Sequence, residues 1–232
     1  MGESTTIAVD LAKSVFEVAV SSRPGRVSER QRLSRAALAR FFAQRPPATV
    51  LLEACGTAHF WAREIERAGH RVRLLPAQHV RRYRQGNKTD RADAKALLEA
   101  FRNEAIRPVP VKTPAQQELT ALHRLRAAWH GTRTARINTL RGLLREQGIA
   151  IPAGAARFVS QALELAGDDD SGLGDTLRFA AFELVAEIRE IERRIDEVER
   201  RLEAIGRQTP LVARLRSVPG IGLLTSTALA GF

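Results

Sequence analysis

The sequence predicts a mixed α/β fold in its first half and an all-helical region after it. Up to about residue 105, three strands come first, and helices then alternate with two further strands. Beyond Pro108 and Pro110 the composition becomes almost entirely helix-forming, and an apolar heptad pattern runs through residues 177–205. The 232 residues, 44% of them hydrophobic, suffice for one good core and a smaller helical part.

The strands are predicted from short apolar runs between turn residues. The first two form a hairpin around the polar turn Ala12-Lys13-Ser14. The third alternates polar and apolar residues and is expected to be exposed, whereas the fourth is apolar throughout and is expected to be central. The predicted strands are residues 5–11, 15–20, 27–33, 49–54 and 72–75.

The helices are predicted from their capping residues. Ser34 and Thr89 are candidate N-caps, and Gly69 closes the helix that Gly56-Thr57 opens. The predicted helices cover residues 34–42, 57–68, a short basic stretch around Val80, and a segment that starts at Thr89. Two or three antiparallel strands followed by strand–helix units are the pattern of the RNase H-like fold, with a mixed sheet and flanking helices.

Four acidic residues lie at the ends of these elements. Asp10 and Glu53 end the first and fourth strands, and Asp90 and Asp93 fall in the first turn after Thr89, three residues apart on one helical face. A carboxylate at the end of an apolar strand is costly to desolvate without a cation or a donor. One such residue alone is usually a turn or cap residue. Several together predict a shared Mg²⁺ site, with Mn²⁺ as the alternative ion, and catalytic roles for all four acids.

The charge balance favours a nucleic-acid partner. The formal net charge is +11, although a generally Arg-rich proteome could explain part of it. Between Arg107 and Arg145 the only acid is Glu118, so we expect this helix to lack acidic partners. The cluster around Tyr83 is either a phosphate-contacting loop or a solvated helix end, and Lys88 either contacts phosphate or neutralises the acids. The candidate contacts are Arg81, Arg82, Tyr83, Arg84, Lys88, Arg124, Arg126, Arg133, Arg136, Arg141 and Arg145.

The second half predicts long helices. One is expected over residues 113–147, followed by a loop at 167–174 and then the heptad helix. The heptads favour a coiled coil between subunits, while a helical hairpin against 113–147 is the alternative. The turn Val218-Pro219-Gly220-Ile221-Gly222 precedes an apolar helix and is either a backbone phosphate nest or a plain helix connection.

These residues also carry a resemblance to a family. The segments Ile7–Lys13, Leu52–Gly56 and Asn87–Ala94 resemble the DEDD family of insertion-sequence transposases, which includes pilin-gene-inverting recombinases and transposases guided by bridge RNA. The resemblance implies a RuvC-like domain that holds Mg²⁺ with the four acids, DNA as substrate, and a structured guide RNA. It also implies a C-terminal domain that supplies a nucleophilic serine. Neither Ser217 nor Ser226 matches that serine, so we assign no nucleophile in this chain.

The combined expectation is a DNA transposase or site-specific recombinase. We expect a RuvC-like domain at 1–105, a basic helical linker at 106–167, a coiled-coil helix at 168–208, and the start of a truncated transposase domain at 209–232. Such a chain would bind metal and nucleic acid, form homo-oligomers, and not complete strand exchange alone. A Holliday-junction-type endonuclease and a non-catalytic guide-RNA-binding module are the alternatives. No signal peptide or membrane span is evident, so a cytoplasmic, nucleoid-associated prokaryotic protein is expected.

Overall fold

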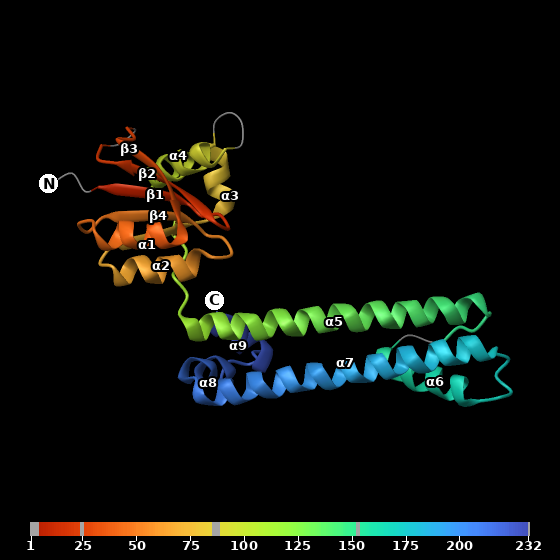
Figure 1. The fold of residues 1–232 in the computed structure, drawn as a ribbon. Coiled ribbons are helices and arrows are strands. Elements are labelled where there is room, and N and C mark those ends of the chain that lie inside the picture. Colours follow the sequence, from red (N-terminus) through yellow and green to blue (C-terminus); the bar gives the residue numbers. More distant parts are fainter. Residues whose placement is uncertain (1–4, 24–25, 85–88, 152–153, 232) are drawn as a thin grey trace. The chain divides into compact units, whose positions relative to one another are not determined.

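The structure is a computed structural model that describes residues 5–23, 26–84, 89–151 and 154–231. The chain divides into two compact units, residues 1–113 and 114–232 (Figure 1).

The first unit contains a five-stranded mixed sheet of order β3-β2-β1-β4-β5. Its strands are β1 (Thr6–Asp10), β2 (Val15–Ser21), β3 (Glu29–Ser34), β4 (Thr49–Glu53) and β5 (Arg71–Leu75). The pairs β1–β2 and β2–β3 are antiparallel, whereas β1–β4 and β4–β5 are parallel. All five predicted strands are present, and this arrangement is consistent with the RNase H-like fold expected from the sequence.

The helices of this unit begin where the sequence placed its capping residues. They are α1 (Arg35–Ala43), α2 (Ala58–Arg67), α3 (Ala77–Val80), the 3₁₀ helix η1 (Arg81–Tyr83) and α4 (Asp90–Phe101). The hydroxyl of Ser34 accepts a hydrogen bond from the Ala37 amide, and that of Thr89 accepts one from Ala92. Both side chains thus satisfy an amide that the first helical turn leaves without a partner.

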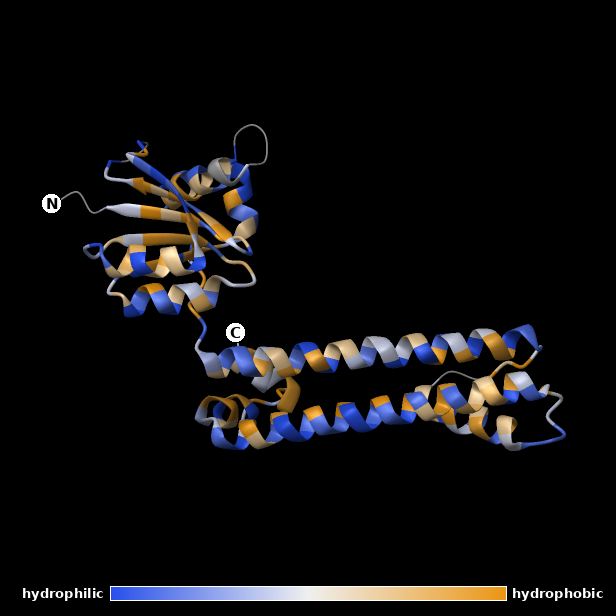
Figure 2. Ribbon diagram, in the orientation of Figure 1, coloured by the Kyte–Doolittle hydropathy of each residue, from blue (hydrophilic) through white to orange (hydrophobic). Residues whose placement is uncertain are grey.

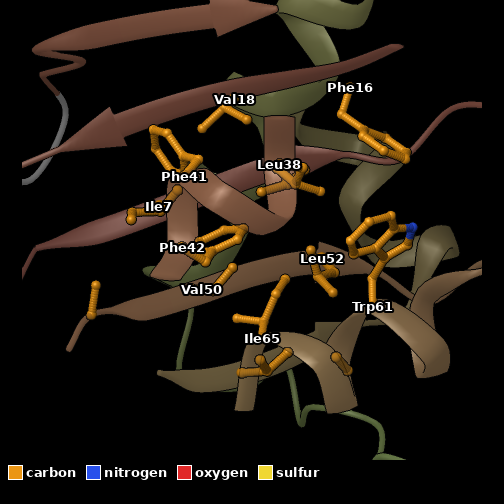
Figure 3. Close-up of a cluster of buried hydrophobic side chains, with 14 of the residues drawn as sticks. Ile7, Phe16, Val18, Leu38, Phe41, Phe42, Val50, Leu52, Trp61 and Ile65 are labelled. Carbon is orange, nitrogen blue, oxygen red and sulfur yellow. The ribbon is translucent and has the colours of Figure 1, made fainter. Parts of the chain in front are cut away.

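Two apolar layers lie on the two faces of the sheet. On one face Ile7, Val18 and Leu52 pack against α1 and α2, where Phe16 and Trp61 meet edge to face at 5.2 Å (Figure 3). On the other face Ala8 and Leu51 pack among α4 residues. Successive side chains of a strand point to opposite faces of the sheet. The residues buried in each layer therefore show which face every position of β1, β2 and β4 points to. Figure 2 shows these strands to be more hydrophobic than β3, as their central positions require.

The segment after α4 is fixed to the first unit. Val109 pairs with Leu74, and Val111 packs against the core beside α2. The amide of Lys112 donates a hydrogen bond to Nδ1 of His59 at 3.1 Å, and Arg63 donates to the Lys112 carbonyl at 2.5 Å. These residues lie in the part of the chain that we expected to be a linker, and they belong instead to the compact N-terminal unit.

All regular elements described in the second unit are helices. Its helices are α5 (Pro114–Glu146), α6 (Ala155–Gly167), α7 (Asp175–Gln208), α8 (Pro210–Arg216) and α9 (Leu223–Gly231). The long helices α5 and α7 run antiparallel to each other (Figure 1). Helix α6 was not predicted as a separate element; its buried face, which includes Phe158 and Ala162, packs beside α7. No helix among the described residues is both long and apolar enough to cross a membrane.

The heptad residues of α7 are buried within the chain. Val185 and Ile188 pack with Leu140 of α5, and Leu202 packs with Leu119 near the other end of the pair. The pattern therefore forms an antiparallel helical hairpin, which was the alternative reading of the heptads. The preferred interpretation, that this seam joins two subunits, is not shown, because the buried seam residues pack against other helices of the same chain.

Candidate metal centre and nucleic-acid interface

Asp10 and Glu53 lie side by side at one edge of the sheet. The parallel pair β1–β4 aligns Val9 with Leu52, so the next residue of each strand is an acid. Val9 and Leu52 point into the layer beneath α1 and α2, so the alternation of side chains directs both carboxylates to the face that α4 covers. Sequence alone predicted this pair from its strand ends, and the register brings it together.

A third acid, which was not among the predicted site residues, lies on the same face. Glu17 of β2 is the direct partner of Asp10 across the antiparallel β1–β2 pair. Its side chain is only 7% exposed and lies 3.9 Å from the Arg30 guanidinium, while Arg32 is its partner on β3. The signal was available, because Glu17 interrupts the otherwise apolar run Val15–Val20 in the way that Asp10 ends its own strand.

Helix α4 carries the other two predicted acids in its first turn, where the helix dipole favours negative charge. Asp93 is 14% exposed and forms an ion pair with Arg84, which comes from the segment just after η1. The backbone of Asp90 begins α4, but its side chain, like the whole of Lys88, lies outside the described residues. Asp93 is therefore held by an arginine in this structure.

The donor chemistry of this centre suits a hard divalent cation, since every predicted ligand is a carboxylate. Among the residues that the structure describes, no group of three or more His, Cys, Asp or Glu side chains is placed to hold a metal ion. Asp10 and Glu53 are adjacent, whereas Asp93 is paired with Arg84. If Asp93 joins the two sheet carboxylates around an ion, Arg84 competes with the metal for its Oδ1 oxygen.

Comparison with known proteins decides the family. A family model described as a transposase, of the DEDD class and IS110 type, matches residues 7–148. The chain belongs to this family of transposases. It is 40% identical over 225 residues, 97% of the chain and 67% of the relative, to a probable family 20 transposase of Pseudomonas aeruginosa.

Two further curated relatives of this DEDD family member are transposases of insertion sequence elements. The transposase for the element IS1328 of Yersinia enterocolitica is 34% identical over 236 residues, which cover 99% of the chain and 68% of the relative. The one for IS1111A of Coxiella burnetii is 33% identical over 229 residues, which cover 99% of the chain and 63% of the relative. The chain thus spans roughly two thirds of the length of these transposases.

In this family member the predicted basic loop lies beside the acidic centre. Arg81 and Arg82 are exposed at η1, while Tyr83 is half-buried and its hydroxyl accepts a hydrogen bond from the Asn103 amide at 2.7 Å. Arg84 is engaged with Asp93. Two arginines of the cluster are therefore exposed to solvent, and a third interacts with a predicted metal ligand.

The α5 arginines have acidic partners on α7, which were not predicted. Three ion pairs link α5 to α7: Arg126–Glu199 at 2.7 Å, Arg133–Glu192 at 3.6 Å and Arg136–Glu187 at 2.6 Å. The premise that this helix lacks acidic partners is wrong, because the antiparallel hairpin supplies them from 50 to 75 residues further along the chain. Arg141 lies 4.7 Å from the Phe158 ring centroid, whereas Arg124 and Arg145 are exposed.

The C-terminal glycine turn joins α8 to α9. Gly220 has φ of +86°, a left-handed conformation that favours glycine, and the Ile221 amide donates a hydrogen bond to the Val218 carbonyl. Ser226 is fully buried in α9, where its hydroxyl donates to the Leu223 carbonyl. The turn followed by an apolar helix was predicted from the sequence, and it is present.

Proposed function

We propose that this chain acts in DNA transposition or site-specific recombination through an Mg²⁺-dependent acidic centre. One observation carries the proposal: the parallel register of β1 and β4 sets Asp10 and Glu53 side by side beneath α4. Membership of a transposase family supports DNA as the substrate. We place the protein in the prokaryotic cytoplasm, acting at the nucleoid.

Asp10, Glu53, Asp90 and Asp93 are proposed to hold the metal. Bound there, Mg²⁺, or Mn²⁺ in its place, would offset phosphate charge and stabilise the oxygens that attack and leave. In this proposal the fold brings carboxylates from two strands and one helix together around the ion. Arg84 holds Asp93 in the metal-free protein and limits the repulsion among the acids until the ion arrives.

The cationic residues are proposed to position nucleic acid around this centre. Arg81, Arg82, Tyr83 and Lys88 would contact the strand that enters the centre, together with Arg84 once Asp93 has released it. The arginines at positions 124, 126, 133, 136, 141 and 145 would form the surface for a structured guide RNA. Arg124 and Arg145 are the strongest candidates for contact with the RNA, because both are exposed. Homo-oligomerisation remains part of the proposal, but by a surface other than the buried α7 seam.

The test compares Asp10→Asn and Glu53→Gln with Glu66→Gln. Glu66 is exposed on α2, which covers the opposite face of the sheet, so this control removes the same charge away from the centre. Titration calorimetry with Mn²⁺ and cleavage or joining of DNA ends, in a chain extended to the length of its relatives, are the readouts. Both centre variants should lose metal binding and DNA processing, and Glu66→Gln should retain both.

The same assay separates the alternatives. Metal-dependent hydrolysis without strand joining, abolished by Asp10→Asn, would support an endonuclease of the Holliday-junction type. Tight, salt-sensitive RNA binding with no DNA processing would support a non-catalytic guide-RNA module. Wild-type metal affinity in both centre variants would contradict the proposed site.

A further inference from the structure

A second feature of the N-terminal unit lies next to the acidic centre. A cleft of 610 Å³ opens between β3, η1 and α4. This volume is in the range of cavities that hold small organic ligands. Its principal lining residues are Arg30, Arg82, Tyr83, Thr89, Lys95 and Glu99.

The wall formed by α4 connects the cleft to the predicted metal ligands. Thr89, Ala92, Lys95 and Glu99 follow one another at spacings of three and four residues and share one face of the helix. With a rise of about 1.5 Å per residue, this wall is about 15 Å long. It begins at the N-cap, immediately before the turn that carries Asp90 and Asp93. A polymer held at the acids can therefore continue along this wall.

The charge of the cleft favours an anion. Arg82 and Lys95 are exposed cations on two of its sides, and Arg30 lies on the third. Among the lining residues that the structure describes, Glu99 is the only acid, and its carboxylate is paired with Arg102 at 3.1 Å. Arg30 is 3.9 Å from Glu17, so the same guanidinium connects the cleft to the acidic row of the sheet.

One aromatic ring completes the cleft. Tyr83, the single tyrosine of the chain, packs its ring against the apolar layer under α4, and its hydroxyl is fixed by Asn103. A ring held in this way loses little conformational freedom when a planar ligand stacks on it. Cations that track a backbone, together with an aromatic face, are the combination by which proteins bind single-stranded nucleic acid.

We propose that this cleft binds single-stranded DNA adjacent to the phosphodiester on which the acidic centre acts. Tyr83 stacks on a base, while Arg82 and Lys95 pair with the flanking phosphates. This inference rests on the proposed function, because it supplies the substrate strand of the same centre. DNA rather than RNA is assigned, since the strand that leaves the cleft reaches the carboxylates of a transposase family member.

The experiment measures binding of a fluorescent oligothymidylate to the full chain by anisotropy, in EDTA. Tyr83→Leu keeps an apolar side chain against α4 but removes the stacking face, and it should weaken binding roughly 5- to 150-fold. Tyr83→Phe keeps the ring and should bind nearly as tightly as wild type. Lys95→Gln should weaken binding and reduce the slope of log K against log salt by about 0.7.

The matched control is Arg40→Gln, which removes one exposed cation from α1 on the opposite face of the sheet. Equal losses in Arg40→Gln and Lys95→Gln would overturn the proposal, as would wild-type affinity in Tyr83→Leu. Tighter binding of oligouridylate with the same dependence on Tyr83 would overturn the assignment to DNA. Because the assay contains no metal, its result is independent of whether the carboxylates hold an ion.

Discussion

Asp10 and Glu17 are directly opposite each other across the antiparallel strands β1 and β2. With Glu53 on the other side of Asp10, three carboxylates lie in one row on three neighbouring strands. Like charges directly opposite on a sheet destabilise it unless a cation compensates them. Arg30 lies 3.9 Å from Glu17 on this face, and a bound cation would further offset the negative charge of the row.

Glu17→Gln should therefore separate stability from metal binding. Without metal, the variant should be as stable as wild type or more stable by up to about 1 kcal/mol, because one member of a like-charged pair is removed. Its affinity for Mn²⁺ should fall. Thermal unfolding with and without Mn²⁺ measures both effects. Glu29→Gln, on β3 and ion-paired to Arg45, is the control that should leave metal affinity unchanged; an unchanged affinity in Glu17→Gln as well would remove Glu17 from the centre.

Arg84→Gln should have the opposite pair of effects. Asp93 is mostly buried and loses its partner in this variant, which should cost about 1–3 kcal/mol of stability in the metal-free protein. Because the guanidinium no longer competes for the carboxylate, Mn²⁺ should bind more tightly. Calorimetric titration measures the affinity for Mn²⁺, and chemical denaturation measures the stability of the metal-free protein. Weaker Mn²⁺ binding in Arg84→Gln would mean that the arginine supports the metal-bound arrangement instead of competing with it.

In the α5–α7 hairpin, the apolar seam should contribute more to the free energy of unfolding than the ion pairs do. Ile188 is fully buried, so Ile188→Ala should destabilise the protein by about 2–5 kcal/mol. Arg136→Gln removes an ion pair at the surface and should cost no more than about 1 kcal/mol. Both values come from denaturation monitored by circular dichroism. If the seam joined subunits instead, Ile188→Ala would lower the oligomeric mass measured by sedimentation, whereas a seam within the chain predicts an unchanged mass.

His59 predicts a pH dependence at the end of the first unit. Burial, followed by the nearby charges of Lys112 and Arg63, lowers the pKa of His59 below its usual 6.5. Because the unfolded state binds the proton more readily, the free energy of unfolding is highest above pH 6.5. It decreases as the pH falls from 6.5 toward the lower pKa of the folded state. Protonation also removes the Nδ1 acceptor of the Lys112 amide. That amide should exchange hydrogen faster at pH 5.5 than base catalysis alone predicts, and His59→Gln should abolish the excess.

The sequence predicted the sheet well because each strand carried its own local signal. Apolar runs between turn residues located β1, β2, β4 and β5, and the capping hydroxyls of Ser34 and Thr89 located α1 and α4. Asp10 and Glu53 followed from the strand ends, since parallel strands end at the same edge. These features depend on neighbours in sequence or on the general geometry of sheets.

Features that depend on distant partners were harder to predict. The partner of the heptad seam was one, because the same pattern serves a coiled coil between subunits and a hairpin within a chain. The glutamates that pair with the α5 arginines were another, since they become neighbours only when the chain turns back. Glu17 interrupts an apolar run, but its place beside Asp10 depends on the register of the hairpin, which that run alone does not give.

The alternation of side chains along β1 has a consequence for how this protein can evolve. Inserting or deleting one residue before Asp10 would turn its carboxylate into the apolar layer beside Phe16 and Leu38 and bring an aliphatic side chain to the edge where Glu53 lies. The buried residues Ile7 and Val9 therefore do more than hold the strand in place. They fix which side chains of β1 face each side of the sheet. A change in the length of β1 is therefore more disruptive than a single substitution in it.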